Sequence, residues 1–454
     1  MMDMKTRSAH GEWSSRFAFI LAATGSAVGL GNIWKFPYIT GENGGGAFVL
    51  VYLICVVVIG IPIMMAESML GRRARQSPIG ALRVLTKEAN ADVNWHYLGW
   101  LGVVAGLFIL SYYSVIAGWA TAYVFKAFIG SFSGGDARDI KELFDNFTGS
   151  PLTLIFWHSL FMCATMWIVA QGVRHGLERA VRLLMPGLFV ILMVLVGYAM
   201  TTGAYEQGLS FLFKPDFSKI TGSAVLIAMG HAFFTLSLGM GAIMVYGAYL
   251  PKNVSIAQTS ILIAVADSVV ALLAGIAIFP IVFANHLEPG SGPGLIFQTL
   301  PIAFGSMTGG WLIGILFFVM LVFAALTSAI SVIEPTVAWL VETDRFDRKT
   351  ACIWTGLAVW LLGLGTVFSF NVWSDVKLFD KTFFQLLDYL TANLMLPIGG
   401  FCIAIFAGWV MAEKHSHAEL DLSHPFYYKL WQVLVRYVAP AGIFLVFLHV
   451  VGVL

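Results

Sequence analysis

The sequence predicts an all-α integral membrane protein in which about eleven helices cross the bilayer. Of the 454 residues, 59% are hydrophobic and only 11% are charged, whereas soluble domains carry about 25% charged residues. The mean hydropathy is +0.83. Apolar runs of about 20 residues, the length that spans hydrocarbon, recur along the whole chain, and two of them are interrupted at their centres.

The predicted spans follow one another with polar connections between them. The longest connections, 71–95, 131–151 and 286–307, are interpreted as loops, and residues 1–454 therefore form a single transmembrane domain. The predicted spans are approximately 15–39, 47–70, 96–130, 152–171, 177–200, 222–250, 254–285, 308–342, 351–370, 382–411 and 426–450.

The interrupted runs are the first and the sixth, which are broken by small and polar residues at 25–32 and 233–241. Backbone that leaves a helix in hydrocarbon must be buried in protein or line a wet cavity. Inverted-repeat transporters place such discontinuous helices around a binding site near the bilayer midplane. The spans therefore group as two five-helix repeats, about 15–200 and 222–411, with an extra helix at about 426–450.

Basic residues gather in connections that fall on one side of the membrane. The clusters are Lys5/Arg7/Arg16, Arg72/Arg73/Arg75, Arg174/Arg179/Arg182 and Arg345/Arg348/Lys349. The positive-inside rule makes this side cytoplasmic, with the N-terminus inside and the C-terminus outside the inner (plasma) membrane. A net charge of +1 gives no argument for a nucleic-acid partner, no cleavable signal peptide is expected at the N-terminus, and the oligomeric state is left open.

The first break combines three glycines with Asn32. Glycine allows carbonyls of Gly25, Ala27 and Val28 to turn toward a ligand, and carbonyl oxygens suit a hard cation. The half-helix that follows offers its N–H groups to an anion such as an amino-acid carboxylate. The alternative for the glycines alone is close helix packing through small residues.

Further oxygen-bearing side chains lie inside apolar spans, at Thr235, Ser237, Asp267, Thr327 and Ser328. The hydroxyls alone favour a structural role, because Ser and Thr in spanning helices usually bond to a carbonyl one turn back. Asp267 is different, since an ionisable residue within a span is expensive and is a functional candidate by default. A cluster of oxygens with one carboxylate suits sodium better than a transition metal.

Two pairs of residues are candidates for gates. Lys35 and Asp388 lie near the outer ends of their spans and can pair across a pathway, although snorkelling of Lys35 to the interface is an alternative. Trp13 and Glu342 lie at the inner ends of theirs and can close the opposite side, although an exposed loop charge is an equal alternative for Glu342.

The fifth span carries Gly176 and Pro186 near its cytoplasmic end, and both residues weaken a helix. A local unwinding there would admit water from inside. An ordinary helix start followed by a kink is the alternative.

No nucleotide-binding or hydrolase motif is present, so the protein is not expected to be an enzyme. A proton-relay role for the intramembrane His231 or Glu334 is a weaker hypothesis.

Several segments together resemble the neurotransmitter:sodium symporters, in their bacterial amino-acid-transporting branch. The resemblance covers nearly the whole chain and implies the fold of the bacterial leucine transporter, with uptake driven by sodium through alternating access. Its most specific segments are Trp13–Arg16, Gly25–Tyr38, Glu42–Phe48, Phe233–Gly241 and Ala324–Ser328.

Carried over by position, the resemblance implies two sodium sites and one substrate pocket. The first sodium would be held by Ala27, Asn32, Thr235 and Asp267, and the second by Gly25, Val28, Ala324, Thr327 and Ser328. The pocket would comprise Ser26, Ala27, Gly29, Ile109, Tyr113, Phe234, Thr235, Ser237, Met240, Ser328 and Val332. Tyr113 would bond the substrate carboxylate and Phe234 would cover it.

Departures from better-known members carry information. Lys35 replaces the usual arginine of the outer gate, so the bidentate fork is lost. Asp267 stands where many members have asparagine, and Ala271 where chloride-dependent members have serine, which predicts chloride independence. The arginine that would pair with Glu342 is replaced by His10, with Arg7 as a possible substitute.

The pocket residues set the expected substrate. Gly29 replaces the aspartate of monoamine transporters, which favours a substrate with its own carboxylate. Ile109, Met240 and Val332 make the side-chain compartment apolar, and methionine adapts to differing shapes. The resemblance therefore implies import of hydrophobic L-amino acids, aliphatic and aromatic, as in the multi-hydrophobic amino acid transporters of this branch. A proton-coupled or exchange-type carrier of the same architecture is the alternative.

Overall fold

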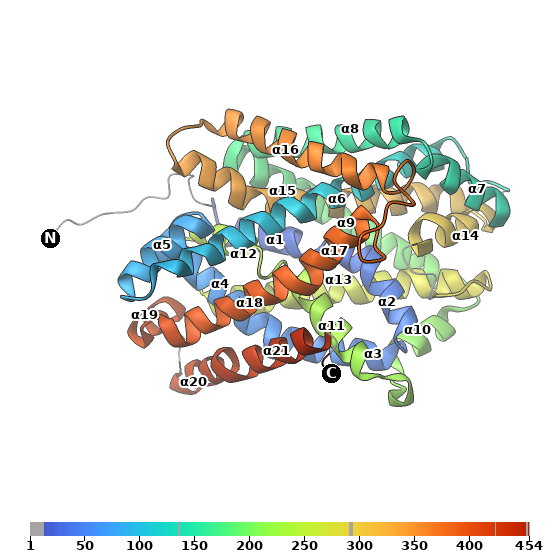
Figure 1. Cartoon of the computed structure of the whole chain (residues 1–454). Coiled ribbons are helices and arrows are strands. Elements are labelled where there is room, and N and C mark those ends of the chain that lie inside the picture. The colour runs from blue at the N-terminus through green and yellow to red at the C-terminus, as the bar shows by residue number, and fades with distance from the viewer. Residues whose placement is uncertain (1–12, 135–136, 290–293, 423, 451–452, 454) are drawn as a thin grey trace.

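The computed structural model describes all residues except 1–12, 135–136, 290–293, 423, 451–452 and 454. Its architecture is all-helical (Figure 1). Within the described residues, eight continuous helices are long and apolar enough to cross a membrane, and the bent pair Arg16–Ala27 and Gly31–Glu42 makes a ninth. The predicted sixth span is a pair of shorter helices, α11 and α12, and the predicted eleventh is α20 with α21. The all-α membrane class is confirmed.

The helices follow the predicted spans, and several are extended or linked by short π-helical turns. Their bounds are α1 Arg16–Ala27, α2 Phe36–Glu42, α3 Gly46–Cys55, α4 Ile61–Ala74, α5 Pro78–Glu88, α6 His96–Phe128, α7 Ala137–Thr148, α8 Pro151–Ala170, α9 Arg179–Ala199, α10 Tyr205–Phe213, α11 Gly222–Thr235, α12 Ala242–Ala248, α13 Ile256–Ala284, α14 Leu300–Ser306, α15 Gly310–Glu342, α16 Arg348–Phe368, α17 Phe383–Asp388, α18 Leu396–Ile405, α19 Glu413–Leu420, α20 Pro425–Val433 and α21 Ala439–Val450.

The interpretation of the longest connections as loops was wrong, because each of them contains a helix: α5, α7 or α14. These helices are too short, or too polar on one face, to register in a search for spans. The start of α5 can nevertheless be recognised in the sequence. The Ser77 side chain accepts a hydrogen bond from the Gly80 backbone N–H, and Pro78 occupies the first helical position, where its missing N–H has no cost.

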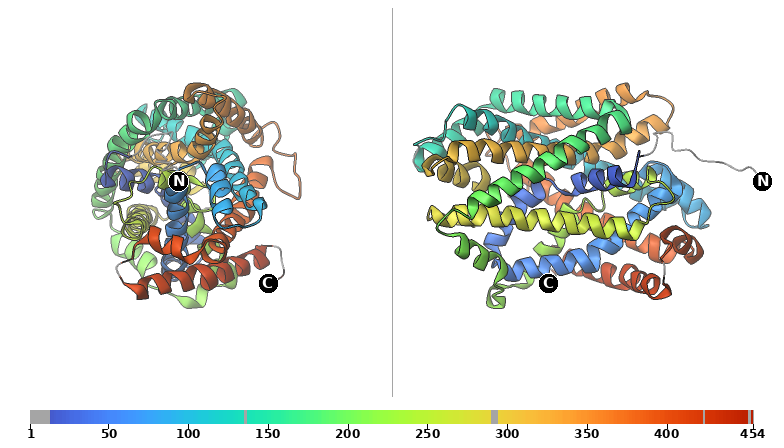
Figure 2. Two further views of the ribbon diagram at one scale, coloured as in Figure 1. Left: turned by 90° about the vertical axis from the view of Figure 1, so that its left-hand side faces the viewer. Right: turned by 180° about the vertical axis from the view of Figure 1, so that it is seen from behind.

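The centre of the molecule is occupied by α1, which is surrounded by longer helices (Figure 1). It contacts α15, α13 and α9. Seen from behind, α9 runs obliquely across the molecule and α13 passes beneath it (Figure 2). Helix α15 packs along α6, and α16 packs on α8.

The short helix α12 is held tightly against α4 by glycines on both helices. A Cβ atom at Gly71 would lie 1.8 Å from the Met244 carbonyl oxygen, and one at Gly247 would lie 2.6 Å from the Ser68 oxygen. No larger residue fits at either position. The second half-helix of the sixth span is therefore fixed to the second span.

The two ends of the helical assembly differ. Helices α5 and α19 lie at one end, and α7, α10 and α14 lie at the other (Figure 1). We call the first the Trp13 end, because the Trp13 ring packs there against Tyr246 of α12 and against Tyr249, which directly follows α12.

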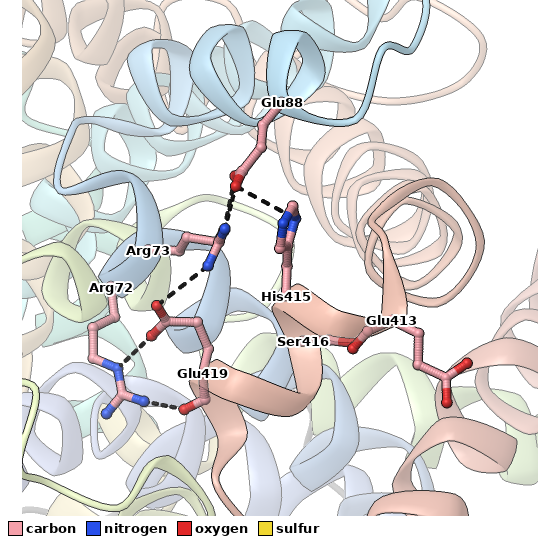
Figure 3. A network of polar contacts seen from close by, with 7 residues as sticks. All are labelled: Arg72, Arg73, Glu88, Glu413, His415, Ser416 and Glu419. Atoms are coloured by element: carbon pink, nitrogen blue, oxygen red, sulfur yellow. Dashed lines mark hydrogen bonds and ion pairs between the residues drawn. The ribbon is translucent and has the colours of Figure 1, made fainter. Parts of the chain in front are cut away.

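An ionic network at the Trp13 end joins α4, α5 and α19 (Figure 3). Arg73 at the end of α4 forms a bidentate pair with Glu88 of α5, with Nε 2.8 Å from Oε2. The neighbouring Arg72, only 5% exposed, donates to Glu419 Oε2 at 3.0 Å. His415 Nδ1 lies 3.4 Å from Glu88 Oε1. The hydrogen bond from Arg73 lowers the pKa of Glu88 below its usual range.

This pKa shift predicts a pH-dependent contribution of Glu88 to stability. Because the folded-state pKa is lowered, the contribution is present above about pH 4.3, the ordinary value for glutamic acid, and is lost as the pH falls through the folded-state value. Glu88→Gln should therefore lower stability at pH 7 by about 0.2–1 kcal/mol. Thermal unfolding in detergent from pH 7 down to about pH 3 measures the difference.

The difference between Glu88→Gln and the wild type should shrink toward the acid end of that range. Glu142→Gln changes an exposed acid of α7 and serves as the control. A constant difference at all pH values would contradict the ionic role of Glu88.

Candidate functional site

The first break lies between Ala27 and Gly31, where the two parts of the first span are bent by 47°. Two backbone N–H groups in this break donate hydrogen bonds to side chains. The Gly29 N–H donates to Asn32 Oδ1 at 3.0 Å, and the Leu30 N–H donates to the Tyr113 hydroxyl at 3.3 Å. A hydroxyl that accepts one hydrogen bond can still donate its own proton, so Tyr113 retains a donor for a ligand.

The second break lies between α11, which ends at Thr235, and α12, which begins at Ala242. Ser237, Gly239 and Gly241 have φ values of 55°, 81° and 79°, in the left-handed region. The Ser237 hydroxyl donates to the Ser26 carbonyl oxygen at 2.9 Å. This bond joins the two breaks directly.

The Gly239 N–H in the second break donates to Glu67 Oε1 at 2.6 Å. Glu67 comes from α4 and is fully buried. The sequence analysis missed this residue, although a carboxylate inside the apolar run 47–70 is the same signal that singled out Asp267. Glu67 holds the unwound backbone of the sixth span.

A small cavity of about 20 Å³ lies between the two breaks. It is lined by all of the residues expected for the substrate pocket, together with Leu30 and Gly31. Those lining residues are Ser26, Ala27, Gly29, Ile109, Tyr113, Phe234, Thr235, Ser237, Met240, Ser328 and Val332.

The carboxylate of Asp267 is buried beside this cavity and makes three kinds of hydrogen bond. Asn32 Nδ2 donates to Oδ1 at 2.7 Å, and the Thr235 hydroxyl donates at 3.0 and 3.1 Å. The Tyr52 hydroxyl donates to Oδ2 at 3.3 Å. All three partners are neutral, so these contacts leave the negative charge of Asp267 without a counter-charge. A buried charge needs a partner of opposite sign, and a hard cation beside Asn32 and Thr235 fits this cluster.

The sequence analysis did not assign Tyr52 to the site. Its ring packs against the imidazole of His231, with 5.3 Å between centroids. In the described part of the chain, both ring nitrogens of the buried His231 lack a hydrogen-bond partner. His231 thus stacks behind the cluster and does not line the cavity.

A second cluster of oxygens lies where α15 meets the first break. The Ser328 hydroxyl is 3.3 Å from the Gly25 oxygen and 3.3 Å from the Val28 oxygen. On the same helix, the Thr327 hydroxyl donates to the Ala324 oxygen at 3.0 Å. Carbonyl and hydroxyl oxygens alone again suit a hard monovalent or divalent cation.

A larger vestibule of about 390 Å³ lies beyond the cavity, on the side away from Trp13. Leu30, Tyr113 and Phe234 line both spaces, so Phe234 stands between them. Lys35 Nζ lies 4.8 Å above the Phe234 ring centroid and 3.8 Å from Asp388 Oδ1. The structure therefore brings the two expected gate residues together above the cavity.

The chain matches the model of the sodium:neurotransmitter symporter family over residues 10–139 and 136–454. The chain belongs to this family. An uncharacterised sodium-dependent transporter of Bacillus subtilis, YhdH, is 38% identical over 98% of both chains. A second, from Haemophilus influenzae, is 35% identical over 96% of this chain and 97% of the relative.

Among solved structures, the chain is similar to the transporter MhsT in complex with L-phenylalanine. The TM-score is 0.90 at 44% identity, over 96% of this chain and 99% of MhsT. The protein is therefore a sodium-dependent, multi-pass membrane transporter with the leucine-transporter type of fold, and not an enzyme.

The symporter is sealed at the Trp13 end. The Trp13 backbone N–H donates to the Tyr249 oxygen at 3.2 Å and its indole N–H to the Tyr246 oxygen at 3.3 Å. Glu342 accepts hydrogen bonds from the Ser77 backbone N–H, at 2.6 Å, and from the Ser77 hydroxyl. The suggested partners of Glu342, His10 and Arg7, lie outside the described residues.

Glu334 of the symporter has a structural partner. It is fully buried, and both its oxygens face Arg348, with 2.5 Å between Oε2 and Nη2. Tyr249 also donates to Glu334, at 2.9 Å. The sequence analysis raised Glu334 as a proton relay and did not anticipate this ion pair.

The fifth span is helical throughout the segment in which unwinding was considered. Gly176 lies in a π-helical turn, Val173–Glu178, and Pro186 lies inside α9. In this structure, Gly176 and Pro186 therefore lie in helical segments. Unwinding between them in another conformation stays a prediction.

The contact of Glu67 with the second break predicts a marked loss of stability in Glu67→Ala. That substitution leaves the buried Gly239 N–H without an acceptor, which costs about 1–3 kcal/mol. Glu67→Gln keeps an acceptor oxygen and should recover most of the loss. Thermal unfolding of the two variants in the same detergent measures the effect, and equal stabilities would show that the bond to Gly239 contributes nothing.

Proposed function

We propose that this transporter imports hydrophobic L-amino acids, both aliphatic and aromatic, by symport with sodium through alternating access. The observation that supports this most directly is the cavity between the two breaks, which is lined by every residue expected for the substrate pocket. One end of the cavity is lined by polar backbone groups and the other by apolar side chains. A hydrophobic amino acid likewise has a polar end, with its amine and carboxylate, and an apolar side chain.

The polar end suits the charged groups of an amino acid. Gly29 presents backbone at the cavity wall, and a Cβ atom there would lie 2.4 Å from Ser328 Oγ. Tyr113 keeps a proton that it can donate to a carboxylate. Because no acidic side chain stands at position 29, a substrate with an amine and no carboxylate has no partner there.

The apolar end selects the side chain of the substrate. Ile109, Met240 and Val332 form its wall, and Phe234 closes it toward the vestibule. Methionine adapts its shape to different partners, which supports a broad range of hydrophobic substrates. MhsT, which is similar over nearly its whole length, binds L-phenylalanine.

Two sodium ions complete the proposed site. The first is held by Asn32, Thr235 and Asp267 with the carbonyl of Ala27. The second is held by the backbone of Gly25, Val28 and Ala324 with the hydroxyls of Thr327 and Ser328. These groups supply only oxygen ligands, which sodium prefers, and the fixed charge of Asp267 makes chloride unnecessary in this proposal.

The protein is proposed to lie in the inner (plasma) membrane. In the proposed orientation, the vestibule faces outside and the Trp13 end faces the cytoplasm. Arg72, Arg73 and Arg348 all lie toward the Trp13 end, in agreement with the positive-inside rule. The Lys35–Asp388 pair and Phe234 then act as the outer gate, and Trp13 acts with Glu342 at the inner gate. Residues about 15–200 and 222–411 form the two repeats.

Uptake into proteoliposomes tests the coupling. Labelled L-phenylalanine and L-leucine should accumulate under an inward sodium gradient, with no effect when gluconate replaces chloride. Asp267→Ala should reduce sodium-driven uptake at least tenfold, roughly the effect of losing one charge-assisted contact. Asp216→Ala, at an exposed loop acid, is the control. Accumulation with potassium in place of sodium would move the assignment to a proton-coupled or exchange carrier.

The close approach at Gly29 predicts that Gly29→Ala weakens substrate binding. The added Cβ atom would displace Ser328 or Tyr113, which lies 3.0 Å away, and such overpacking costs about 1–3 kcal/mol. The dissociation constant for L-phenylalanine should rise roughly 5- to 150-fold. Gly230→Ala in α11 meets nothing within 4 Å and should bind normally; equal affinities for the two variants would contradict the proposed pocket.

A further inference from the structure

The connection between α16 and α17 exposes an unusual amount of apolar surface. We call residues 372–381 the vestibule loop, because Asp380 and Lys381 line the vestibule. Single exposed apolar residues are ordinary on a protein surface, whereas neighbouring ones mark an interaction site. Half of the residues in the vestibule loop are large and apolar, and each is between 41% and 81% exposed: Val372, Trp373, Val376, Leu378 and Phe379.

The vestibule loop projects from the side of the helical assembly. The connection between α16 and α17 lies in front of the helices and does not reach past the end that carries α7 (Figure 1). Seen from the Trp13 end, the same connection stands out sideways from the helices (Figure 2, left). The sides of a helical membrane protein face lipid and its two ends face water. The loop therefore extends toward lipid on the vestibule side of the membrane.

The tip of the vestibule loop is a tight turn that presents a phenylalanine. Leu378 and Lys381 exchange backbone hydrogen bonds at 2.9 and 3.1 Å, and φ is 52° at Phe379 and 59° at Asp380. Two-residue turns of this kind favour asparagine and glycine, and a bulky residue at positive φ is strained. The Phe379 residue is also 81% exposed. Burial of its ring in lipid would offset both the strain and the exposure.

The composition of the vestibule loop suits the boundary between lipid head groups and chains. The Trp373 ring packs edge-on against Phe368, the last residue of the membrane-spanning α16, with 5.1 Å between centroids. Tryptophan is enriched at this boundary. Lys377 and Lys381 can lay their stems along lipid and extend their ammonium groups to phosphate groups. The loop also carries two acids, which keep it out of the hydrocarbon centre.

The vestibule loop is joined to α17 without slack. The Thr382 hydroxyl accepts a hydrogen bond from the Gln385 backbone N–H at 3.4 Å, and the Gln385 side chain accepts one from the Thr382 N–H at 2.9 Å. Lys381 Nζ lies 5.1 Å from the centroid of the Tyr389 ring, which follows α17. Asp388 is the last residue of α17. A force on the loop therefore reaches the helix that carries the acid paired with Lys35.

We propose that the vestibule loop binds the lipid surface on the vestibule side of the membrane, with Leu378 and Phe379 inserted at the level of the head groups. This contact holds the start of α17 and thereby the position of Asp388. The lipid contact itself requires only the membrane-spanning fold. Its effect on the outer gate rests on the proposed transport function.

Fluorescence quenching of the full-chain protein in nanodiscs tests the lipid contact. A bimane label is attached at Phe379→Cys, in a chain whose accessible cysteines, Cys163 and Cys402, are replaced by alanine. Lipids with a nitroxide near the head group should quench this label strongly, and iodide in the water should quench it weakly. The same label at Glu142→Cys, at an exposed acid of α7, should show the opposite pattern. A label at Phe156→Cys, on an exposed apolar position of α8, provides the lipid-facing reference.

Removal of the apolar tip tests the link to α17. In Leu378→Ser/Phe379→Ser, hydrogen exchange of a peptide that covers 382–395 should rise in nanodiscs, because lipid no longer holds the start of the helix and local opening becomes easier. Phe217→Ser removes a 58% exposed aromatic ring from the connection between α10 and α11 and should leave exchange in 382–395 unchanged. If the double variant does not fold, Phe379→Ser alone should give the same change more weakly.

Strong quenching of the label at position 379 by iodide, with none by the nitroxide lipid, would overturn the proposal, because the loop would then lie in water. Protection from both quenchers would also overturn it, since the loop would then cover the vestibule or contact another protein molecule. Lipid quenching with unchanged exchange in 382–395 would overturn the role of the contact at α17. Failure of the transport proposal has a different signature, because uptake by the wild type would be absent while the quenching pattern stayed the same.

Discussion

The structure depends on one constraint, which is that two helices unwind in the middle of a membrane protein and their backbone groups must still find partners. Three unwound N–H groups, those of Gly29, Leu30 and Gly239, donate to the side chains of Asn32, Tyr113 and Glu67. An unpaired group at this depth would cost several kcal/mol. The site therefore consists of the two breaks and the side chains that stabilise them. The side-chain atoms that pair with the unwound backbone can also contact a ligand.

The buried carboxylate of Asp267 adds a second constraint on the site. Among the described residues, Asp267 accepts hydrogen bonds from the neutral side chains of Asn32, Thr235 and Tyr52, and the proposed sodium ion would compensate its buried charge. The proposed sodium ion would contact both breaks at once, because Asn32 belongs to one and Thr235 to the other. The bond from Ser237 to the Ser26 oxygen ties the breaks together in the same way. In the proposed function, ion binding and assembly of the substrate cavity are thus coupled.

Much of this could be predicted from the sequence, for physical reasons that differ from residue to residue. The breaks were visible because Gly, Ser and Asn are unusual inside an apolar run, and Asp267 because a carboxylate in a span is expensive. The same rule would have found Glu67. The hydrogen bond from Ser14 to Glu178 could not be found in this way, because Glu178 lies beside arginines at a helix start and Ser14 is 164 residues away. The helices α5, α7 and α14 were missed because hydropathy over a span length does not register short helices.

The two ends of the molecule are closed by different kinds of contact, and this difference bears on how they open. At the vestibule, a single lysine and aspartate stand 3.8 Å apart over an aromatic ring, and their partly exposed charges can exchange readily with water. At the Trp13 end, the seal is a buried indole with backbone acceptors on α12, and α12 is itself fixed to α4 by glycine packing. Such a seal cannot loosen gradually, because close-packed surfaces have discrete arrangements. Under the proposed alternating access, Trp13 and the start of α1 would therefore have to leave α12 together.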